Sequence, residues 1–220
     1  MNSIMNVKKD IEGIIGLLVQ EGLSVYQNYP VIKQMSEGFQ TVEWSNIINL
    51  SVTLKNISYE DVYNEIDKNK DYTIKLIDGN IVQMQYTYHN NHLFSHRLAM
   101  FPSPTLLSFE DDPEIYEKDE MFGDILARNI VSVPIRFDYS KNDIESEHEH
   151  PKSHVTLGQY KNCRIPAYGP ISPVIFIQFV LKNFYNSIYN TYIKGSLTGG
   201  CKNYKTIRVS ETKELHFNVI

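Results

Sequence analysis

The sequence predicts an α+β fold in which an antiparallel meander sheet packs against an N-terminal helix and a long C-terminal helix. Apolar side chains recur at helical spacing in residues 3–21 and again in residues 174–192, while residues 72–101 alternate as strands do. No internal repeat and no convincing linker divides the 220 residues. We therefore expect a single α+β domain over residues 1–220.

The first 54 residues predict a helix, a bend and strand structure. The first apolar stripe stops at Gly22, which is a common helix terminator. Tyr29-Pro30 disfavours an uninterrupted helix, so a bend or loop is expected in residues 26–34. Residues 38–54 are expected to form one or two strands.

A second, shorter helix is expected before the meander. Ser58 is followed three residues later by Asp61, which resembles a capping arrangement. Apolar and aromatic side chains then recur at helical spacing, and the helix is expected to end near Lys70.

The meander is the clearest strand signal in the chain. Residues 72–77 and 81–88 flank Asp78-Gly79, the strongest short hairpin signal, and Asn90-Asn91 predicts a second turn before residues 92–101. In the middle strand, we expect Gln83, Gln85, Thr87 and His89 on one face and Val82, Met84, Tyr86 and Tyr88 on the other.

Loops and short strands are expected in the middle of the chain. The acidic residues 110–124 predict a solvated loop with a short helix, and residues 140–150 a flexible loop. Residues 131–139 predict a strand, while residues 154–157 and 163–167 predict a hairpin or two short strands.

The last third of the chain predicts a helix followed by a hairpin. Ser172 is placed to cap the helix and Pro173 to occupy its first position, and the apolar spacing continues to Tyr192. Residues 205–210 and 215–220 are expected to close the chain as a final hairpin.

Composition excludes several classes of protein. The chain has 26 acidic and 21 basic side chains and a net charge of -5, which disfavours a broad nucleic-acid cradle but not a few arginines in a cleft. Its longest uncharged apolar run, residues 173–181, is too short to span a bilayer, so no membrane association is expected. Cys163 and Cys201 form neither a disulfide framework nor a zinc motif, which favours reduced thiols in a cytoplasmic protein.

Histidines are the first candidates for chemistry because they cluster in the sequence. His148, His150 and His154 lie in one segment, but Pro151 excludes the helical pair of a zincin. We interpret His148 as part of a solvent-exposed acidic loop. His150 and His154 are the best site candidates, since imidazole suits general acid or base catalysis. A metal-dependent hydrolase using these three histidines and Asp138 is a less favoured alternative.

Charged strand residues are the second set of candidates. Arg136 and Asp138 are two residues apart in a strand, so they point to the same face and present a cation and a carboxylate together. Arg164 lies in the next strand region and suits a phosphate or carboxylate through its planar guanidinium group. The alternative for Arg136 and Asp138 is a surface ion pair that stabilises the protein little, and the alternative for Arg164 is a structural arginine paired with Glu or Asp.

Two further residues are weaker candidates. His96 and Arg97 are adjacent in one strand, so only one of them can join a given site, and a strand histidine is more often structural. Cys163 is a candidate nucleophile if His150 or His154 lies beside it, but a buried thiol is the favoured interpretation. The sequence contains no phosphate-binding glycine loop, serine nucleophile elbow or CxxC motif.

The sequence resembles the bacterial family known as domain of unknown function 2290 over most of its length. The residues that carry the resemblance are His150-Pro151, Ser153-His154, Gly158, Cys163-Arg164-Ile165-Pro166, Pro173 and Phe184-Tyr185. The resemblance implies a bacterial intracellular protein and gives no reaction. Single-domain proteins of this sort are associated with toxin or phage-defence modules, which is an association without a mechanism.

Two functional hypotheses follow from these residues. The first is an RNase-like phosphodiesterase that needs no cofactor, in which His150 and His154 act on an RNA substrate while Arg164 or Arg136 stabilises the phosphorane charge, with Asp138 beside them. The second is a non-enzymatic module that binds a protein partner encoded in the same operon. A concave site in which the histidines and an arginine converge favours the first, and an exposed aromatic patch elsewhere favours the second.

Overall fold

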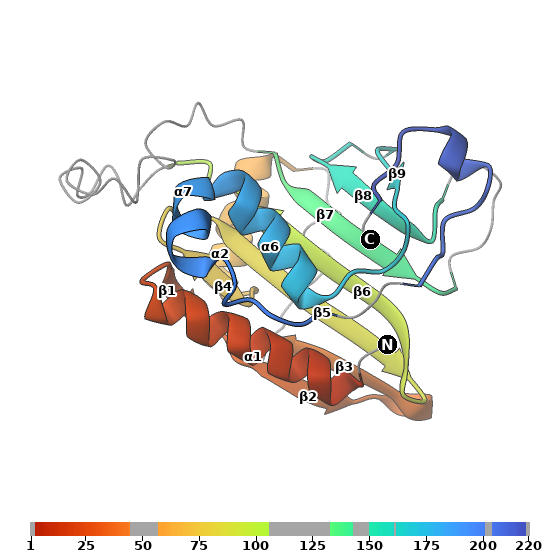
Figure 1. Cartoon of the computed structure of the whole chain (residues 1–220), viewed down its shortest axis with the longest axis horizontal. Coiled ribbons are helices and arrows are strands. Elements are labelled where there is room, and N and C mark those ends of the chain that lie inside the picture. The colour runs from red at the N-terminus through yellow and green to blue at the C-terminus, as the bar shows by residue number, and fades with distance from the viewer. Residues whose placement is uncertain are drawn as a thin grey trace.

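The computed structural model describes residues 3–44, 57–105, 133–142, 150–160, 162–200 and 204–218. Within these residues, nine strands form one antiparallel sheet that packs against an N-terminal helix and C-terminal helices, so the predicted α+β class is confirmed (Figure 1). The strands are Ser24–Gln27 (β1), Pro30–Gln34 (β2), Phe39–Trp44 (β3), Ile74–Leu76 (β4), Ile81–His89 (β5), His92–Phe101 (β6), Ile135–Ser140 (β7), Ser153–Leu157 (β8) and Ile165–Pro166 (β9). The α-helices are Ile4–Gln20 (α1), Tyr59–Asn69 (α2), Pro173–Phe184 (α6) and Asn186–Ile188 (α7).

The sheet follows the chain in order. Strands β4 to β9 are each hydrogen-bonded to the next, which is a meander, and β1 pairs with β4 at one end. The strand pair β2–β3 joins the sheet through β5. Cross-strand partners and burial place the residues of β5 on the two predicted faces.

Helices α1 and α6 lie side by side over one face of the sheet, which we call the covered face (Figure 1). Helix α1 begins where predicted, because the Ser3 side chain accepts a hydrogen bond from the amide of Asn6. Both helices bury apolar stripes against side chains such as Met84, Leu98 and Phe137. This apolar layer is the main core of the protein.

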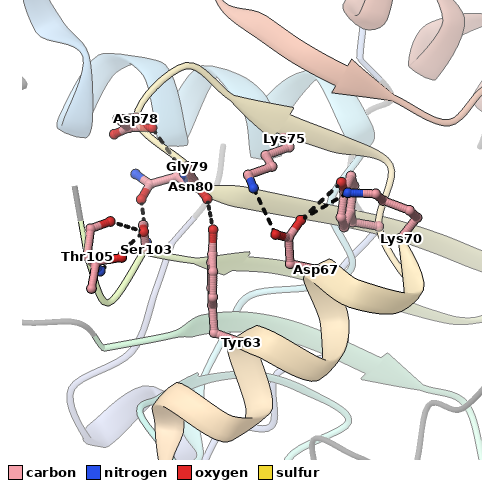
Figure 2. A network of polar contacts seen from close by, with 10 residues as sticks. Tyr63, Asp67, Lys70, Lys75, Asp78, Gly79, Asn80, Ser103 and Thr105 are labelled. Atoms are coloured by element: carbon pink, nitrogen blue, oxygen red, sulfur yellow. Dashed lines mark hydrogen bonds and ion pairs between the residues drawn. The ribbon is translucent and has the colours of Figure 1, made fainter. Parts of the chain in front are cut away.

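The opposite face carries helix α2 at one end only. The helix confirms the prediction of a capped segment, since the Ser58 side chain accepts from the amide of Asp61. Figure 2 shows how α2 is tied to the sheet: the Tyr63 hydroxyl donates to the carbonyl of Gly79 in the β4–β5 turn, and Asp67 accepts from Lys75 at 2.9 Å. The rest of this face, which we call the open face, has no described helix over it.

Three predicted elements differ from the structure. The bend expected in residues 26–34 is confined to residues 28–29, and the rest of that stretch lies in β1 and β2, because Pro30 is the first residue of β2, a position that proline tolerates. The C-terminal helix predicted to reach Tyr192 is interrupted at Tyr185: α6 ends at Phe184, and helical turns resume in α7 and in a π-helical turn, Tyr189–Ile193. At this interruption the hydroxyl of Tyr185 accepts from Asn80 at 2.7 Å and lies 2.9 Å from both carboxylate oxygens of Asp78, a tertiary network that holds Tyr185 out of helical geometry.

The predicted C-terminal hairpin is also wrong. Residues 204–218 instead run beside β9, where the amide of Tyr168 donates to Phe217 and the amide of Thr206 donates to Tyr168, each at 2.8 Å. Gly169 makes this possible, because a Cβ there would lie 2.1 Å from the carbonyl oxygen of Tyr204.

Several predictions fall outside the described residues. These are the strand structure expected over residues 45–54, the acidic segment 110–124, and the loop residues 143–149 with His148. Cys201 also lies outside them.

Candidate functional site

The open face carries a row of four polar side chains on four consecutive strands. Gln85 on β5 is the cross-strand partner of Arg97 on β6, Arg97 that of Asp138 on β7, and Asp138 that of His154 on β8. Direct partners in an antiparallel sheet point to the same face. The sheet register therefore fixes this row.

A pocket of about 1110 Å³ lies over the row. All five residues predicted from the sequence line it: Arg136, Asp138, His150, His154 and Arg164. They come from β7, from β8 and the residues before it, and from the segment that leads into β9. The structure thus brings the predicted residues together, while their catalytic roles stay predictions.

Asp138 is the electrostatic centre of the pocket. Its Oδ1 lies 3.3 Å from Nε of Arg97, and its Oδ2 lies 3.8 Å from Nε of Arg136 and 3.9 Å from Nε2 of His154. The described residues that line the pocket include three guanidinium groups, those of Arg97, Arg136 and Arg164, and no carboxylate besides Asp138. The pocket therefore carries an excess of positive charge on a protein that is acidic overall.

The surroundings of His154 determine its tautomer. Its Nδ1 lies 3.0 Å from the carbonyl oxygen of Pro151, which can only accept a hydrogen bond, so Nδ1 carries the proton. Nε2 of the neutral ring is then an acceptor that faces the pocket. Burial lowers the pKa of His154 below its ordinary value, although the charge of Asp138 opposes this shift. His154 is therefore neutral at pH 7, and its unprotonated Nε2 can accept a proton.

His150 lies directly beside His154. The two imidazole rings are 5.1 Å apart between centroids and nearly perpendicular, at 81°. Pro151 follows His150 and is buried, which fixes the chain between the two rings. The pair therefore presents two imidazole rings to one pocket.

Arg164 is close enough to Arg136 for its positive charge to affect the pKa of Arg136. Burial lowers the pKa of Arg136, Asp138 raises it, and the positive charges of Arg97 and Arg164 lower it further. The guanidinium group remains charged at pH 7 because its ordinary pKa is so high. Several cations held near one another attract an anion that relieves their repulsion.

Sequence reasoning missed Arg97 as a member of this site. The alternation of β6 separated Arg97 from His96, and the register shows that Arg97 is the one on the open face. The side chain of His96 lies on the covered face, where its Nε2 accepts from the amide of Ile171 at 3.1 Å. Only the pairing of β6 with β7, which the sequence does not reveal, could have placed Arg97 beside Asp138.

The remaining alternatives receive less support from the described residues. In the part of the chain that the structure describes, no three His, Cys, Asp or Glu side chains are grouped as a metal site requires, and His148 lies outside that part. Cys163 lines the pocket, half-buried, and its Sγ accepts from the amide of Leu157 at 3.4 Å. Among the described helices, none is long and apolar enough to cross a membrane.

Comparison with known proteins assigns the chain to a family but identifies no reaction. The sequence model of a family described as an uncharacterized conserved protein, DUF2290, matches residues 18–219. The chain belongs to the DUF2290 family. The match includes every residue of the pocket described above. Searches of curated proteins and of solved structures found no match.

Proposed function

We propose that this protein is an RNase-like phosphodiesterase whose active site is the pocket on the open face. The observation that carries the proposal is the convergence of three arginines and two histidines around Asp138. Arginine clusters bind phosphate oxygens through paired hydrogen bonds. A histidine beside such a cluster can move the protons that cleavage of a phosphodiester requires.

The chemistry assigns a role to each group. His154 Nε2 takes the proton of a ribose 2′-hydroxyl, whose oxygen forms a bond to the adjacent phosphorus. The bond from phosphorus to the 5′ oxygen breaks, and His150 in its protonated form donates a proton to that oxygen. The products are a 2′,3′-cyclic phosphate and a 5′-hydroxyl.

Asp138 and the arginines support this reaction electrostatically. Asp138, 3.9 Å from Nε2 of His154, stabilises the imidazolium ion that forms when His154 accepts the proton. Arg97, Arg136 and Arg164 stabilise the charge that builds on the phosphorane oxygens. Because the three charges are local to the pocket, a net charge of -5 for the chain does not prevent RNA binding there.

The direct test is cleavage of an end-labelled single-stranded RNA by the purified protein, analysed on a sequencing gel. We expect cleavage by the wild type, and a loss of about 100- to 10,000-fold in His154→Asn, since general acid or base catalysis contributes that much. Asparagine keeps an amide donor near the position of Nδ1, so the contact with Pro151 can persist. His216→Asn is the matched control, because His216 lies in the C-terminal segment and not in the pocket.

A cellular test examines the toxin or phage-defence setting. The wild type and the His150→Ala and His154→Ala variants are expressed in bacteria from a tightly controlled promoter, and growth and total RNA are compared. We expect growth arrest and RNA breakdown with the wild type only, at equal amounts of folded protein. Intact RNA both in cells and in the purified assay would overturn the proposal and favour a module that binds a protein partner.

A further inference from the structure

The pocket has two ends of different chemistry. One end holds the arginines, the histidines and Asp138. The other end is lined mainly by apolar and aromatic side chains from the residues around α2, β6 and the turn after β8: Ile57, Tyr59, Val62, Phe101, Pro134 and Tyr160. A charged end next to an aromatic end matches a nucleotide, which joins a phosphate to a flat, weakly polar base.

The turn that carries Tyr160 is anchored on both sides. The amide of Gly158 donates to the carbonyl of Pro134 at 2.7 Å, the amide of Cys163 donates to that of Tyr160 at 3.1 Å, and the Gln159 side chain donates to that of Ile57 at 3.2 Å. Despite this, Tyr160 is 76% exposed. A large ring on a fixed backbone loses little conformational freedom when a ligand stacks on it.

Gly158 leaves space for the Tyr160 ring beside the turn. The backbone of Gly158 has a φ of 66°, which favours glycine, and a Cβ there would lie 3.2 Å from Cδ2 of Tyr160. The ring therefore lies against the turn, where a side chain at residue 158 would crowd it.

The aromatic end and the arginine cluster lie close together where the chain enters β7. Pro134, which holds the turn of Tyr160, and Arg136 are two residues apart, so their backbones are separated by roughly 7 Å along an extended chain. Arg136 in turn contacts Asp138. The aromatic end and the phosphate-binding end are therefore neighbours.

We propose that Tyr160 stacks on a nucleobase whose phosphate is held by the arginine cluster, so that the pocket recognises a nucleotide unit and not phosphate alone. This inference rests on the proposed function for the location of the phosphate. It adds a base-binding residue and predicts single-stranded substrates, because only an unpaired base offers its face for stacking.

The test compares two small ligands that differ in the base. Adenosine 5′-monophosphate and ribose 5-phosphate are titrated calorimetrically into the wild type, Tyr160→Ala and Tyr160→Phe. We expect Tyr160→Ala to weaken binding of adenosine 5′-monophosphate by about 5- to 100-fold, the range that loss of one stacked ring produces. Tyr160→Phe keeps the ring and is expected to change the affinity by less than about threefold. Ribose 5-phosphate should bind all three proteins alike.

Tyr29→Ala is the matched control, since Tyr29 is an exposed tyrosine that does not line the pocket. Equal binding of adenosine 5′-monophosphate by the wild type and Tyr160→Ala, or no binding by the wild type, would overturn the inference. So would a parallel loss of both ligands, because Tyr160 would then support the phosphate site or the fold. Base-dependent binding in a protein that cleaves no RNA would keep the inference and reject the phosphodiesterase.

Discussion

The two faces of the sheet are built from the same strands and carry opposite chemistry. On the covered face, Phe137 on β7 packs edge-to-face on Phe176 of α6, with ring centroids 5.8 Å apart. On the open face, the next residue of β7 is Asp138, which lies among arginines and a histidine. Apolar burial stabilises the fold, whereas partly buried charges cost stability. The charges grouped on the open face therefore lower stability instead of raising it, which is typical of a functional site.

Removing a ring from the covered face should destabilise the protein far more than truncating a side chain on the open face. Phe176 is fully buried, so Phe176→Ala should lower the free energy of unfolding by about 3–5 kcal/mol, through lost burial and the cavity left behind. Denaturant unfolding measures the change. Thr87→Ala on the open face, where Thr87 is half-buried in the pocket wall, should change it by less than about 0.5 kcal/mol. Equal losses would mean that both faces stabilise the fold alike.

A second prediction uses the pH dependence of stability. Burial lowers the pKa of His96 on the covered face from 6.5 to about 4, although the charge of Asp138 opposes this shift. Between these values the unfolded chain binds a proton that the folded protein does not, so stability falls as pH decreases from 6.5 to 4. The loss amounts to about 3 kcal/mol at most. The lowered pKa of His154 adds a loss of the same sign.

His96→Gln separates the two histidines. Its amide oxygen offers an acceptor for the amide of Ile171, as Nε2 of His96 does, but it does not titrate. Denaturant unfolding of both proteins at several pH values should give a shallower slope for the variant. The same slope in the two proteins would assign the acid sensitivity to other groups.

A further prediction concerns the stability contributed by residues 204–218, the segment beside β9 at the edge of the sheet. Gly169→Ala would place a Cβ 2.1 Å from the carbonyl oxygen of Tyr204, so residues 204–218 must shift, at a cost of about 1–3 kcal/mol. Gly13→Ala is the matched control in α1, where a Cβ meets no atom within 4 Å. That control should stabilise the protein by about 0.5–1 kcal/mol, since alanine favours a helix. Thermal unfolding of both variants would detect these opposite shifts.

Most helices, turns and strands could be predicted because their signals lie in residues that are close together in the sequence. The Ser58 and Ser172 caps, the Asp78-Gly79 turn and the alternation of β5 are of this kind. The break at Tyr185 depends on a contact with Asp78, which is 107 residues away in sequence, and no local pattern contains it. The site shows the same division. Alternation placed Arg136 and Asp138 on one face, whereas the partnership of Asp138 with Arg97 depends on strand register.

The chain order of the polar row affects when it forms during synthesis. Gln85, Arg97, Asp138 and His154 lie on strands that are consecutive in the chain, so they leave the ribosome in the order in which they pair. Helix α6, which shields the other side of these strands, emerges only afterwards. A nascent chain that ends before α6 therefore contains every residue of the row but lacks much of the apolar layer that packs on the covered face of these strands. The apolar layer behind the row is complete only after α6 and the residues that follow it have been made.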